Sequence, residues 1–360
     1  EGKGHEALDC FEQMEREGLS ADDVTFICIL KACGNLRAIE KGMQIHDEII
    51  HRDLLKKNVV LGNGLIDMYA KCGMLAKARQ VLEELHVRDV VTWNALVAGY
   101  VQHNQGHEAL NCYERMQREG IAPNGVTFTC VLKACSSIGA INKGKQIHDE
   151  IITRGLLEKN IVLGTALVDM YAHCGLFTKA QEVLQELHVR DVVAWSTLIA
   201  GYAQEGHFEE ALKCFAQMQK EGLSPDDITF VSVLNACSHS GKIDEAQDYY
   251  ENMKSKYGIA PKIEHYTCMV VVFGYAGRFD KAISVIRTMP SPDDPSVWVA
   301  LLSACRKRGN VKLGKLAFEQ AIELDSSYCA AYVLMANTYA AAGMQEDAEM
   351  VEAMRLRYVG

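Results

Sequence analysis

Two short strings in the chain contain the residue types of a hydrolytic zinc site. His46-Asp47-Glu48 and His148-Asp149-Glu150 both spell H-x-E, the first half of the zinc deaminase signature, in which His binds the metal and Glu transfers protons. The second half, P-C-x-x-C, does not occur in the sequence. The two strings lie in similar surroundings, where two copies of one catalytic base would serve no purpose. We therefore interpret them as solvated helix residues and predict that this chain is not an enzyme.

The thirteen cysteines are the other residues that could hold a metal or form disulfides. None of them forms a C-x-x-C pair. Cys28 and Cys33 are five residues apart, as are Cys130 and Cys135, and no histidine is in register with either pair. An odd number of singly placed cysteines at helical spacing is typical of reduced core residues. Glycine-rich nucleotide signatures are also missing, so we predict neither a metal nor another cofactor.

The composition limits the classes of protein that remain. A hydrophobic content of 49% is enough for an extensive core and too high for a disordered chain. The 37 Lys and Arg residues against 47 Asp and Glu residues give a net charge of −10, which excludes a uniformly basic coat for nucleic acid. A polyanion would have to meet a local stripe of positive charge. No window has the roughly 18 apolar residues of a membrane span, so we expect no membrane partner.

The dominant feature of the sequence is a repeat of 102 residues. GHEALDCFEQMEREGLSAD at 4–22 returns as GHEALNCYERMQREGIAPN at 106–124 and again, less closely, at 208–226. LGNGLIDMYAKCG at 61–73 matches LGTALVDMYAHCG at 163–175 with the same offset. A fixed period of this kind indicates a stacked array rather than a single globular domain.

Each period contains three smaller units, for example 90–124, 125–160 and 161–191. Every unit shows two apolar patterns at helical spacing, separated by a turn. In the first of them Gly120 occupies the place of a left-handed helix cap, and Pro123 follows as a stop. Alternating strand patterns and hairpin turns are absent. We predict an all-α fold, an α-solenoid of stacked helix–turn–helix repeats wound as a right-handed superhelix.

The units resemble those of plant PLS-class pentatricopeptide repeat (PPR) proteins with C-terminal extension (E) motifs, the type found among RNA-editing factors. VVTWNALVAGY with EALNCYERMQREGIAPN looks like a P motif, VTFTCVLKACSSIGAINKGKQIHDEI like an L motif, and LGTALVDMYAHCGLFTKAQEVL like an S motif. The resemblance covers the whole chain. It divides the chain into a partial P motif 1–22, L 23–58, S 59–89, P 90–124, L 125–160, S 161–191, P 192–226, a terminal L-like motif 227–262, a terminal S-like motif 263–294, and two extension motifs 295–328 and 329–360, the first similar to a tetratricopeptide repeat.

The resemblance implies that the fifth and last residues of each P and S motif read one RNA base together. All these residues are small and carry hydrogen-bonding oxygens or amides. In the absence of the repeat they would be expected to cap helices or form turns, whereas five units in register favour base reading. The pairs are Asn63 with Asp89, Asn94 with Asn124, Thr165 with Asp191, Ser196 with Asp226, and Thr267 with Asp294.

Other positions are implied to hold the RNA without reading it. The second residues of the P and S motifs would sandwich the bases, with core packing as the alternative that the residues leave open; they are Val60, Val91, Val162 and Val193. Glu264 breaks this pattern in the motif of Thr267. Lys71 is the implied phosphate contact. The L motifs have Ile27, Thr129 and Val231 at the fifth position, and two of these cannot hydrogen-bond a base.

The function implied is sequence-specific binding of single-stranded RNA in a mitochondrion or chloroplast, which positions a C-to-U editing deaminase supplied downstream or in trans. The resemblance implies that the array runs parallel to the RNA, so that the readout over 59–294 is, from 5′ to 3′, U, C or U, any, G, G, any, G. A deaminase-domain protein and other editing factors would contact the L and extension motifs. Because a P motif needs about 35 residues and 1–22 contains 22, we expect this chain to be the C-terminal part of a longer array, with its targeting peptide upstream.

Two alternatives remain open on the residues alone. One is a protein-interaction scaffold, since AIELDSSYCAAYVLMANTYAAAG at 321–343 is similar to a tetratricopeptide repeat and the net charge is acidic. The other is a structural RNA-binding component of an organellar ribosome that uses the solenoid without base reading. The pairing of fifth and last residues favours base reading over both.

Overall fold

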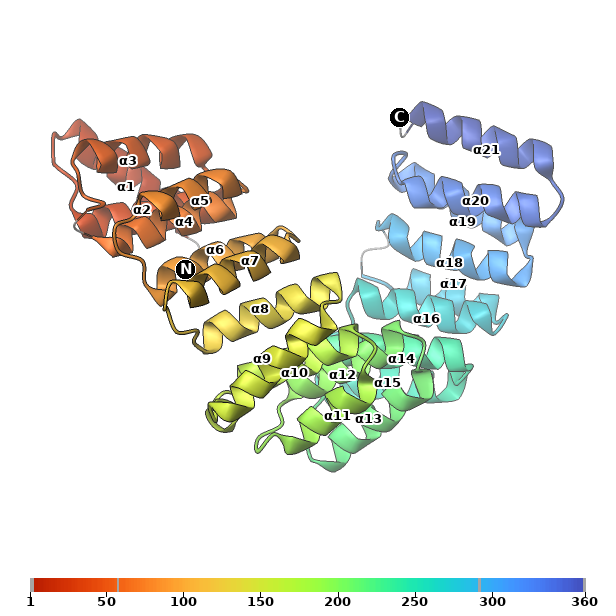
Figure 1. Ribbon diagram of the computed structural model, residues 1–360. Helices are drawn as coiled ribbons and strands as arrows, with labels where there is room; N and C mark the ends of the chain where they lie inside the picture. The colour runs from red at the N-terminus through yellow and green to blue at the C-terminus, as the bar shows by residue number, and fades with distance from the viewer. Residues whose placement is uncertain (1–2, 57, 291–292, 359–360) are drawn as a thin grey trace. The chain divides into compact units, whose positions relative to one another are not determined.

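The structure, a computed structural model, describes residues 3–56, 58–290 and 293–358. Within these ranges every regular element is a helix, and no strand occurs (Figure 1). The ends of the first and last motifs, 1–2 and 359–360, lie outside the described residues. The predicted all-α solenoid is confirmed.

The chain forms two units, residues 1–189 and 190–360, each a stack of helix pairs. The N-terminal unit contains α1 (Gly4–Arg16), α2 (Asp23–Leu36), α3 (Ile39–His51), α4 (Val59–Lys71), α5 (Leu75–Glu84), α6 (Val90–Gln102), α7 (Gly106–Arg118), α8 (Gly125–Ile138), α9 (Ile141–Thr153), a 3₁₀ turn (Leu157–Lys159), α10 (Ile161–His173) and α11 (Phe177–Glu186). The C-terminal unit contains α12 (Val192–Gln204), α13 (Phe208–Lys220), α14 (Asp227–Ser240), α15 (Ile243–Ser255), α16 (Ile263–Tyr275), α17 (Phe279–Arg287), α18 (Pro295–Arg308), α19 (Val311–Leu324), α20 (Cys329–Ala341) and α21 (Gln345–Tyr358).

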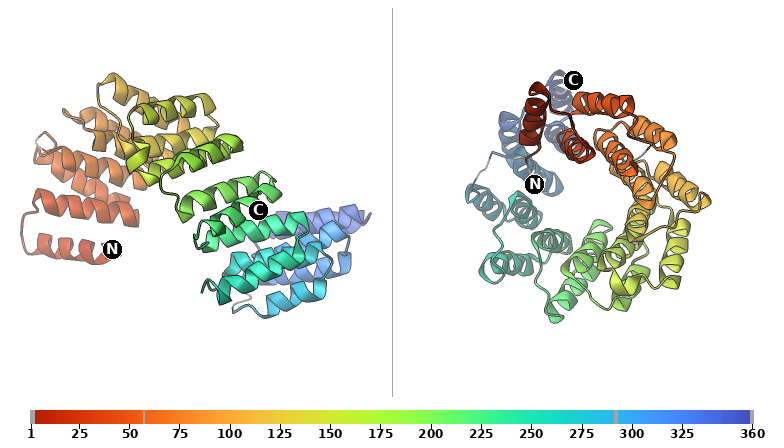
Figure 2. Two further views of the ribbon diagram at one scale, coloured as in Figure 1. Left: turned by 90° about the horizontal axis from the view of Figure 1, so that it is seen from below. Right: turned by 90° about the vertical axis from the view of Figure 1, so that its left-hand side faces the viewer.

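Even-numbered helices, which we call first helices, form one layer of each unit, and the odd-numbered second helices form the other (Figure 2). Each first helix packs against its own second helix and against the next first helix of its unit, as α4 does with α5 and α6. The first helices begin at residues 23, 59, 90, 125, 161, 192, 227, 263, 295 and 329. The division into P, L and S motifs itself stays a prediction.

Short polar side chains start most of the first helices. Asp or Asn at the residue before the helix accepts a backbone N–H of the first turn, which satisfies a donor that the helix itself leaves unpaired. These caps are Asp22, Asn58, Asp89, Asn124, Asn160, Asp191, Asp226 and Asp294. The interpretation of such residues as caps is therefore correct, and it bears directly on the base-reading pairs below.

The core lies between the two layers and contains the apolar positions that repeat along the sequence. Trp93, Leu96 and Val97 of α6 are at most 1% exposed. Neighbouring first helices approach closely: a Cβ at Gly99 would lie 2.6 Å from the Cβ of Ala70, so any larger residue would force α4 and α6 apart. Among the described residues, no helix is long and apolar enough to cross a membrane.

The cysteines are all free thiols. Their interpretation as core residues holds for those that are buried, such as Cys33 and Cys135, and burial raises the pKa of these two thiols to about 11 and about 12. It is wrong for Cys10, Cys28 and Cys329, which are exposed because they point outward from helices at the surface. No group of three or more His, Cys, Asp or Glu side chains that could hold a metal ion occurs in the described ranges.

Candidate nucleic-acid interface

Four positions recur on one side of each first helix, and their exposure ranges from exposed, as at Val60, to buried, as at Asn63. At 3.6 residues per turn, the second, fifth, ninth and thirteenth residues of a helix lie within an arc of about 80°. We call this side the open face; in α4 it consists of Val60, Asn63, Asp67 and Lys71. Because the same four positions recur in each first helix, the open faces within one unit form a continuous strip.

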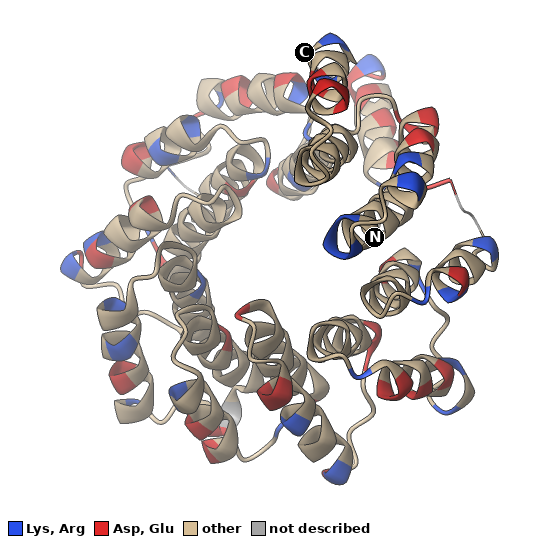
Figure 3. Cartoon of the chain, turned by 90° about the vertical axis from the view of Figure 1, so that its right-hand side faces the viewer, with Lys and Arg blue, Asp and Glu red and all other residues tan. Residues whose placement is uncertain are grey.

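The open faces carry few charges. In Figure 3 the charged residues, coloured blue and red, lie mostly on the second helices. The first helices α6, α12 and α20 contain no charged residue at all. The net charge of −10 is therefore concentrated away from the open faces, and the overall acidity of the chain is no argument against an anionic ligand on them.

The second residues of these helices form a row of exposed branched side chains. Their exposed fractions are 49% for Val60, 52% for Val91, 66% for Val162 and 56% for Val193. Core packing, the alternative left open by the residues, is therefore excluded for all four. Valine is stiff because both branches leave Cβ, so these side chains can project as fixed apolar wedges.

The row also includes L-type helices, which sequence reasoning did not assign to it. Val24 and Val126 in the N-terminal unit and Ile228 in the C-terminal unit occupy the same position and are 66%, 58% and 62% exposed. The sequence contains a signal for this assignment, because Val24, Val126 and Ile228 each begin a V-T-F or I-T-F string. Glu264 interrupts the row at α16, as expected from its type.

Asn94 and Asn124 are joined in a hydrogen-bond network of three residues, the third being Thr127. The Nδ2 of Asn94 donates to Oδ1 of Asn124 at 3.1 Å, and the Oδ1 of Asn94 accepts from the Thr127 hydroxyl at 2.7 Å. Oδ1 of Asn124 also accepts from the backbone N–H of Thr127 at 3.0 Å. The Oδ1 of Asn124 accepts several hydrogen bonds and the Oδ1 of Asn94 accepts one, while one N–H of Asn94 and the amide group of Asn124 keep N–H donors that no bond within this network uses.

Asn63 and Asp89 are connected more loosely. The Nδ2 of Asn63 donates to Oδ1 of Asp89 at 3.4 Å, and the Oδ1 of Asn63 is buried without a hydrogen-bond partner. The Thr92 hydroxyl here donates to Asp89 instead, at 2.8 Å. Burial raises the pKa of Asp89, but the hydrogen bonds from Thr92 and Asn63 outweigh it and hold the pKa below its usual range. This pair therefore keeps a carboxylate and an unpaired amide acceptor.

Ser196 and Asp226 also lie in contact in the C-terminal unit, although the Ser196 hydroxyl donates to the carbonyl of Val192 at 2.7 Å. The Ser196 hydroxyl lies 3.4 Å from Oδ1 of Asp226 and 2.5 Å from the hydroxyl of Thr229. Thr229 in turn donates to Asp226 through its backbone N–H at 2.8 Å. Ser196 is buried, with 5% of its surface exposed.

The remaining two pairs differ. Thr165 donates to the carbonyl of Ile161 at 3.1 Å and belongs to the N-terminal unit, whereas Asp191 caps α12 in the C-terminal unit through the N–H of Ala194. Thr267 donates to the carbonyl of Ile263 at 2.8 Å. Among the described residues no hydrogen bond joins Thr267 to Asp294, which caps α18 through the N–H of Ser296.

A threonine that sequence reasoning missed separates the linked pairs from these two. In each linked pair the third residue of the following helix is Thr92, Thr127 or Thr229, whose hydroxyl contacts the pair. The corresponding residue is Ala194 after Asp191 and Val297 after Asp294. The missed signal is the string [D/N]-x-x-T, which is a capping box in sequence form. The Oδ1 atoms of Asp89, Asn124 and Asp226 therefore both cap a helix and contact the fifth residue of the pair.

Lys71 does not present a free charge. Its Nζ donates to Asp67 Oδ2 at 2.7 Å, one turn back on the same open face. The equivalent residues in α10 are Asp169 and His173, with Nδ1 of His173 3.1 Å from Oδ1 of Asp169. Burial raises the pKa of Asp169. A phosphate contacting Lys71 would therefore compete with a neighbouring carboxylate.

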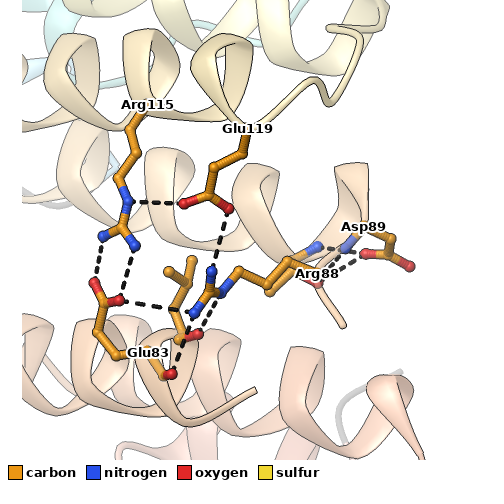
Figure 4. A network of polar contacts seen from close by, with 7 residues as sticks. Glu83, Arg88, Asp89, Arg115 and Glu119 are labelled. Carbon is orange, nitrogen blue, oxygen red and sulfur yellow. Dashed lines mark hydrogen bonds and ion pairs between the residues drawn. The ribbon is translucent and has the colours of Figure 1, made fainter. Parts of the chain in front are cut away.

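An ion-pair network fixes the backbone at the first of these pairs (Figure 4). Arg88, the residue before Asp89, donates to the carbonyl of Leu82 at 2.8 Å and to Glu119 at 3.2 Å. Arg115 bridges Glu83, through Nη2 at 2.8 Å, and Glu119, through Nε at 2.9 Å. The network ties the ends of α5 and α7 to the start of α6, which holds Asp89 in place.

The two H-x-E histidines are packed rather than solvated, so that interpretation is wrong for them. Nδ1 of His46 lies 2.8 Å from the Tyr69 hydroxyl, and Nδ1 of His148 lies 2.9 Å from the Tyr171 hydroxyl. The Nε2 atom of both rings is buried without a partner. Burial lowers the pKa of both histidines. Each ring braces the second helix of an L-type unit against the next first helix.

Models of known protein families match the repeats of this chain. The PPR repeat family model matches two stretches, each about one and a half units long. The PPR repeat model matches six stretches. The residues matched by the two models make up more than half of the chain. The matched residues are 88–137 and 190–239 for the first, and 1–19, 63–90, 126–156, 165–192, 228–257 and 264–291 for the second. The chain belongs to the pentatricopeptide repeat family.

Several PPR proteins of Arabidopsis thaliana are similar along nearly the whole chain. A mitochondrial one is 39% identical over 344 residues, which are 96% of this chain and 62% of the relative. The chloroplastic protein CRR2 is 38% identical over 357 residues, 98% of this chain and 54% of the relative. This PPR chain thus spans about half the length of the curated relatives it matches.

Solved PPR structures share the fold. A crystal structure of the PPR protein PPR10 in complex with an 18-nucleotide psaJ RNA element has a TM-score of 0.68 at 18% identity and covers 99% of this chain and 59% of that chain. A crystal structure of PPR10 from maize has a TM-score of 0.54 at 21% identity, with 98% and 56% covered.

Proposed function

We propose that this PPR chain binds single-stranded RNA along its open faces and reads one base with each fifth–last pair. The observation that carries the proposal is the Asn94–Asn124–Thr127 network beside the exposed Val91. It combines fixed hydrogen-bond donors with an apolar wedge, the two elements that recognise an unstacked base. That PPR10 was crystallised with RNA on the same fold supports this proposal.

The hydrogen-bond capacities give a physical reason for different base choices. The Asn94–Asn124 pair keeps unused N–H donors, which suit the O2 and N3 acceptors of cytosine. The Asn63–Asp89 pair keeps a carboxylate acceptor on Asp89, whose Oδ1 receives the bonds from Asn63 and Thr92, and such an acceptor suits the N3–H donor of uracil. Both choices agree with the readout that the resemblance implies, U followed by C or U.

The same resemblance suggests a role for this chain in RNA editing. The PLS-class motif order and the extension motifs 295–328 and 329–360 are those of C-to-U editing factors, so the chain would position a deaminase supplied downstream or in trans. Relatives assigned to mitochondria and to chloroplasts support an organellar location. The L and extension motifs would contact a deaminase-domain protein and other editing factors.

The test is a fluorescence titration at fixed salt with seven-nucleotide RNAs flanked by spacer. An RNA carrying U, C, A, G, G, A, G should bind more tightly than its shuffled version and than the same sequence as DNA. Replacing the exposed Val91→Ser should weaken binding of the matched RNA without changing the melting temperature. Equal affinity for matched and shuffled RNA would exclude base reading and leave the structural ribosomal role.

A protein-docking role is the second candidate, and the extension motifs favour it. Leu316, Met350 and Leu356 in α19 and α21 are 53%, 55% and 62% exposed. Large apolar side chains that are exposed at a protein surface can contribute to protein interaction sites. Changing Met350→Ser and Leu356→Ser should abolish capture of a deaminase-domain protein and leave RNA affinity unchanged if both roles coexist.

A further inference from the structure

The helix pair α18–α19 has a charge that differs from the rest of the chain. Between residues 295 and 318 there are five basic residues and no acidic one, in a protein with a net charge of −10. The five are exposed and lie in the last turn of α18 and the first turns of α19. We call them the basic corner: Arg306, Lys307, Arg308, Lys312 and Lys315.

Helix stability does not explain the basic corner. Cations in the last turn of α18 are favoured by the helix dipole, which accounts for Arg306 to Arg308. Lys312, however, lies in the first turn of α19, where the dipole disfavours a positive charge. Other second helices of this unit begin with acidic residues instead, for example Glu209 in α13 and Asp244 in α15.

Acidic side chains do not neutralise the basic corner. Within the part of the chain that the structure describes, none of its five residues forms an ion pair, although most other exposed clusters on second helices do, as Lys242 does with Glu209. Arg308 donates through Nε to the backbone carbonyl of Tyr275 at 2.7 Å. This bond fixes one guanidinium and leaves its charge available.

The basic corner is continuous with the open faces. Lys307 is the thirteenth residue of α18, the open-face position that Tyr275 occupies in α16 and His239 in α14. The Nζ of Lys307 lies 3.7 Å from the centre of the Tyr275 ring, and the rings of Tyr275 and His239 are 5.7 Å apart. Burial, followed by the charge of Lys307, lowers the pKa of His239. The side chains of His239, Tyr275 and Lys307 therefore lie in one row, in which two rings are followed by a cation.

We propose that the basic corner binds the phosphate backbone of single-stranded RNA on the 3′ side of the nucleotides facing the base-reading pairs. This inference rests on the proposed function, which supplies the ligand and its 5′-to-3′ direction along the array. Cations without an acidic partner beside aromatic rings, here the partly exposed Tyr275 and the exposed His239, are the arrangement that single-stranded nucleic acid binds without sequence preference. The extension motif 295–328 thereby holds the RNA segment that follows the nucleotides read by 59–294.

The test compares three RNAs: one covering only the seven read nucleotides, one with eight adenosines added on its 3′ side, and one with the same addition on its 5′ side. The chain should bind the 3′-extended RNA more tightly than the other two. If three phosphates are contacted, the gain should shrink by about 18-fold between roughly 50 and 200 mM salt, since each contact adds about 0.7 to the log–log slope for single strands.

Two variants of the basic corner test whether its residues cause the tighter binding of the 3′-extended RNA, and a third variant is the control. R306Q/K307Q/R308Q should bind all three RNAs with the affinity that the wild type has for the short one. Because R308Q removes the bond to Tyr275, R306Q/K307Q/K312Q/K315Q should give the same result with Arg308 intact. K213Q/K254Q/R287Q removes three exposed cations from α13, α15 and α17 and should retain the full gain.

The outcomes separate the two proposals. If the wild type binds the short RNA but gains nothing from the 3′ extension, the inference is overturned and base reading stands. If the basic-corner variants keep the gain, the cations are not the contact, and an acidic protein surface becomes the partner to seek. If no RNA binds, the proposed function fails first.

Discussion

Asn94 donates from its Nδ2 to Oδ1 of Asn124, 3.1 Å away, although thirty residues separate them in the sequence. The bond spans the boundary between α6 and α8, because Asn124 is the cap of α8. Neighbouring repeats are thus joined at the atoms that would face a base. A base on this pair would be read by two repeats together.

Exchanging this pair should change one base preference. Asn94→Thr with Asn124→Asp creates the Thr–Asp combination present at Thr165 and Asp191, for which the implied base is G. A mispaired base leaves buried donors unsatisfied, which costs roughly 1–3 kcal/mol or about 5- to 150-fold in affinity. Titration against four RNAs that differ only at this nucleotide measures the change.

The matched control for that exchange is Val231→Thr, at the fifth position of an L-type helix. It should change no base preference, because Lys262, the last residue of that unit, cannot complete such a pair. A wild-type order of affinities in the double variant would show that the positional code does not operate in this protein.

Thr127→Val should reduce both stability and base selectivity. The buried hydroxyl bonds to Asn94 and Asn124 and belongs to the capping box of α8, so its loss should cost about 1–2 kcal/mol in the free energy of unfolding. Selectivity should fall at the Asn94 nucleotide only. Urea denaturation and the four-RNA titration measure the two effects.

Thr92→Val provides the comparison, because Thr92 contacts Asp89 and not Asn63. It should destabilise the protein to a similar extent and alter selectivity one nucleotide further to the 5′ side. Equal loss of selectivity at both nucleotides in either variant would mean that the hydroxyls act through global stability.

Asp67→Asn should strengthen RNA binding. It removes the carboxylate that holds Lys71 at 2.7 Å and frees the ammonium for a phosphate. One additional contact should steepen the log–log salt dependence of affinity by about 0.7. Asp67→Asn with Lys71→Gln should abolish the gain, and an unchanged slope in the single variant would exclude Lys71 as a phosphate contact.

Stability should fall below a pH of about 6.5 because of His46 and His148. The ordinary value of 6.5 applies to the unfolded chain, and burial lowers the pKa of both rings in the folded chain. Above that pH both states are neutral and the rings contribute nothing. As the pH drops through it, the unfolded chain binds protons first, so the free energy of unfolding decreases until the folded pKa is passed.

His46→Gln with His148→Gln should flatten this dependence between about pH 6.5 and 5, as measured by denaturation midpoints. The matched control is His5→Gln with His107→Gln, two exposed histidines on second helices. If the control variant flattens the curve equally, the two buried rings are not its cause.

Much of the fold could be predicted because repetition makes a local pattern visible many times. The helices follow from apolar spacing and from caps such as Asp89 and Asn124, both of which act within one turn. The exposure of Val60 could not be predicted with the same certainty. An apolar residue at the start of a helix is buried or exposed according to where the neighbouring repeat lies, and this depends on packing between helices.

The sequence paired the candidate site residues by position, and it did not predict the contacts between them. Ser196 and Asp226 were paired from their positions, but the bridging hydroxyl of Thr229 depends on side-chain geometry across 33 residues. Thr267 and Asp294 occupy the same fifth and last positions of a repeat but remain unlinked, and Val297 stands there in place of the threonine. The packed His46 was missed because its partner Tyr69 belongs to the next unit.

The shared role of Asp89, Asn124 and Asp226 as cap and as half of a pair limits how such a protein can evolve new targets. A helix tolerates Asp, Asn, Ser or Thr at its cap and loses about 1 kcal/mol with most other residues. The requirement for a helix cap therefore restricts which residue types can occupy the last position of each repeat, whatever ligand is bound. New specificities can arise freely at the fifth position, while the last position can change only among residues that still start a helix.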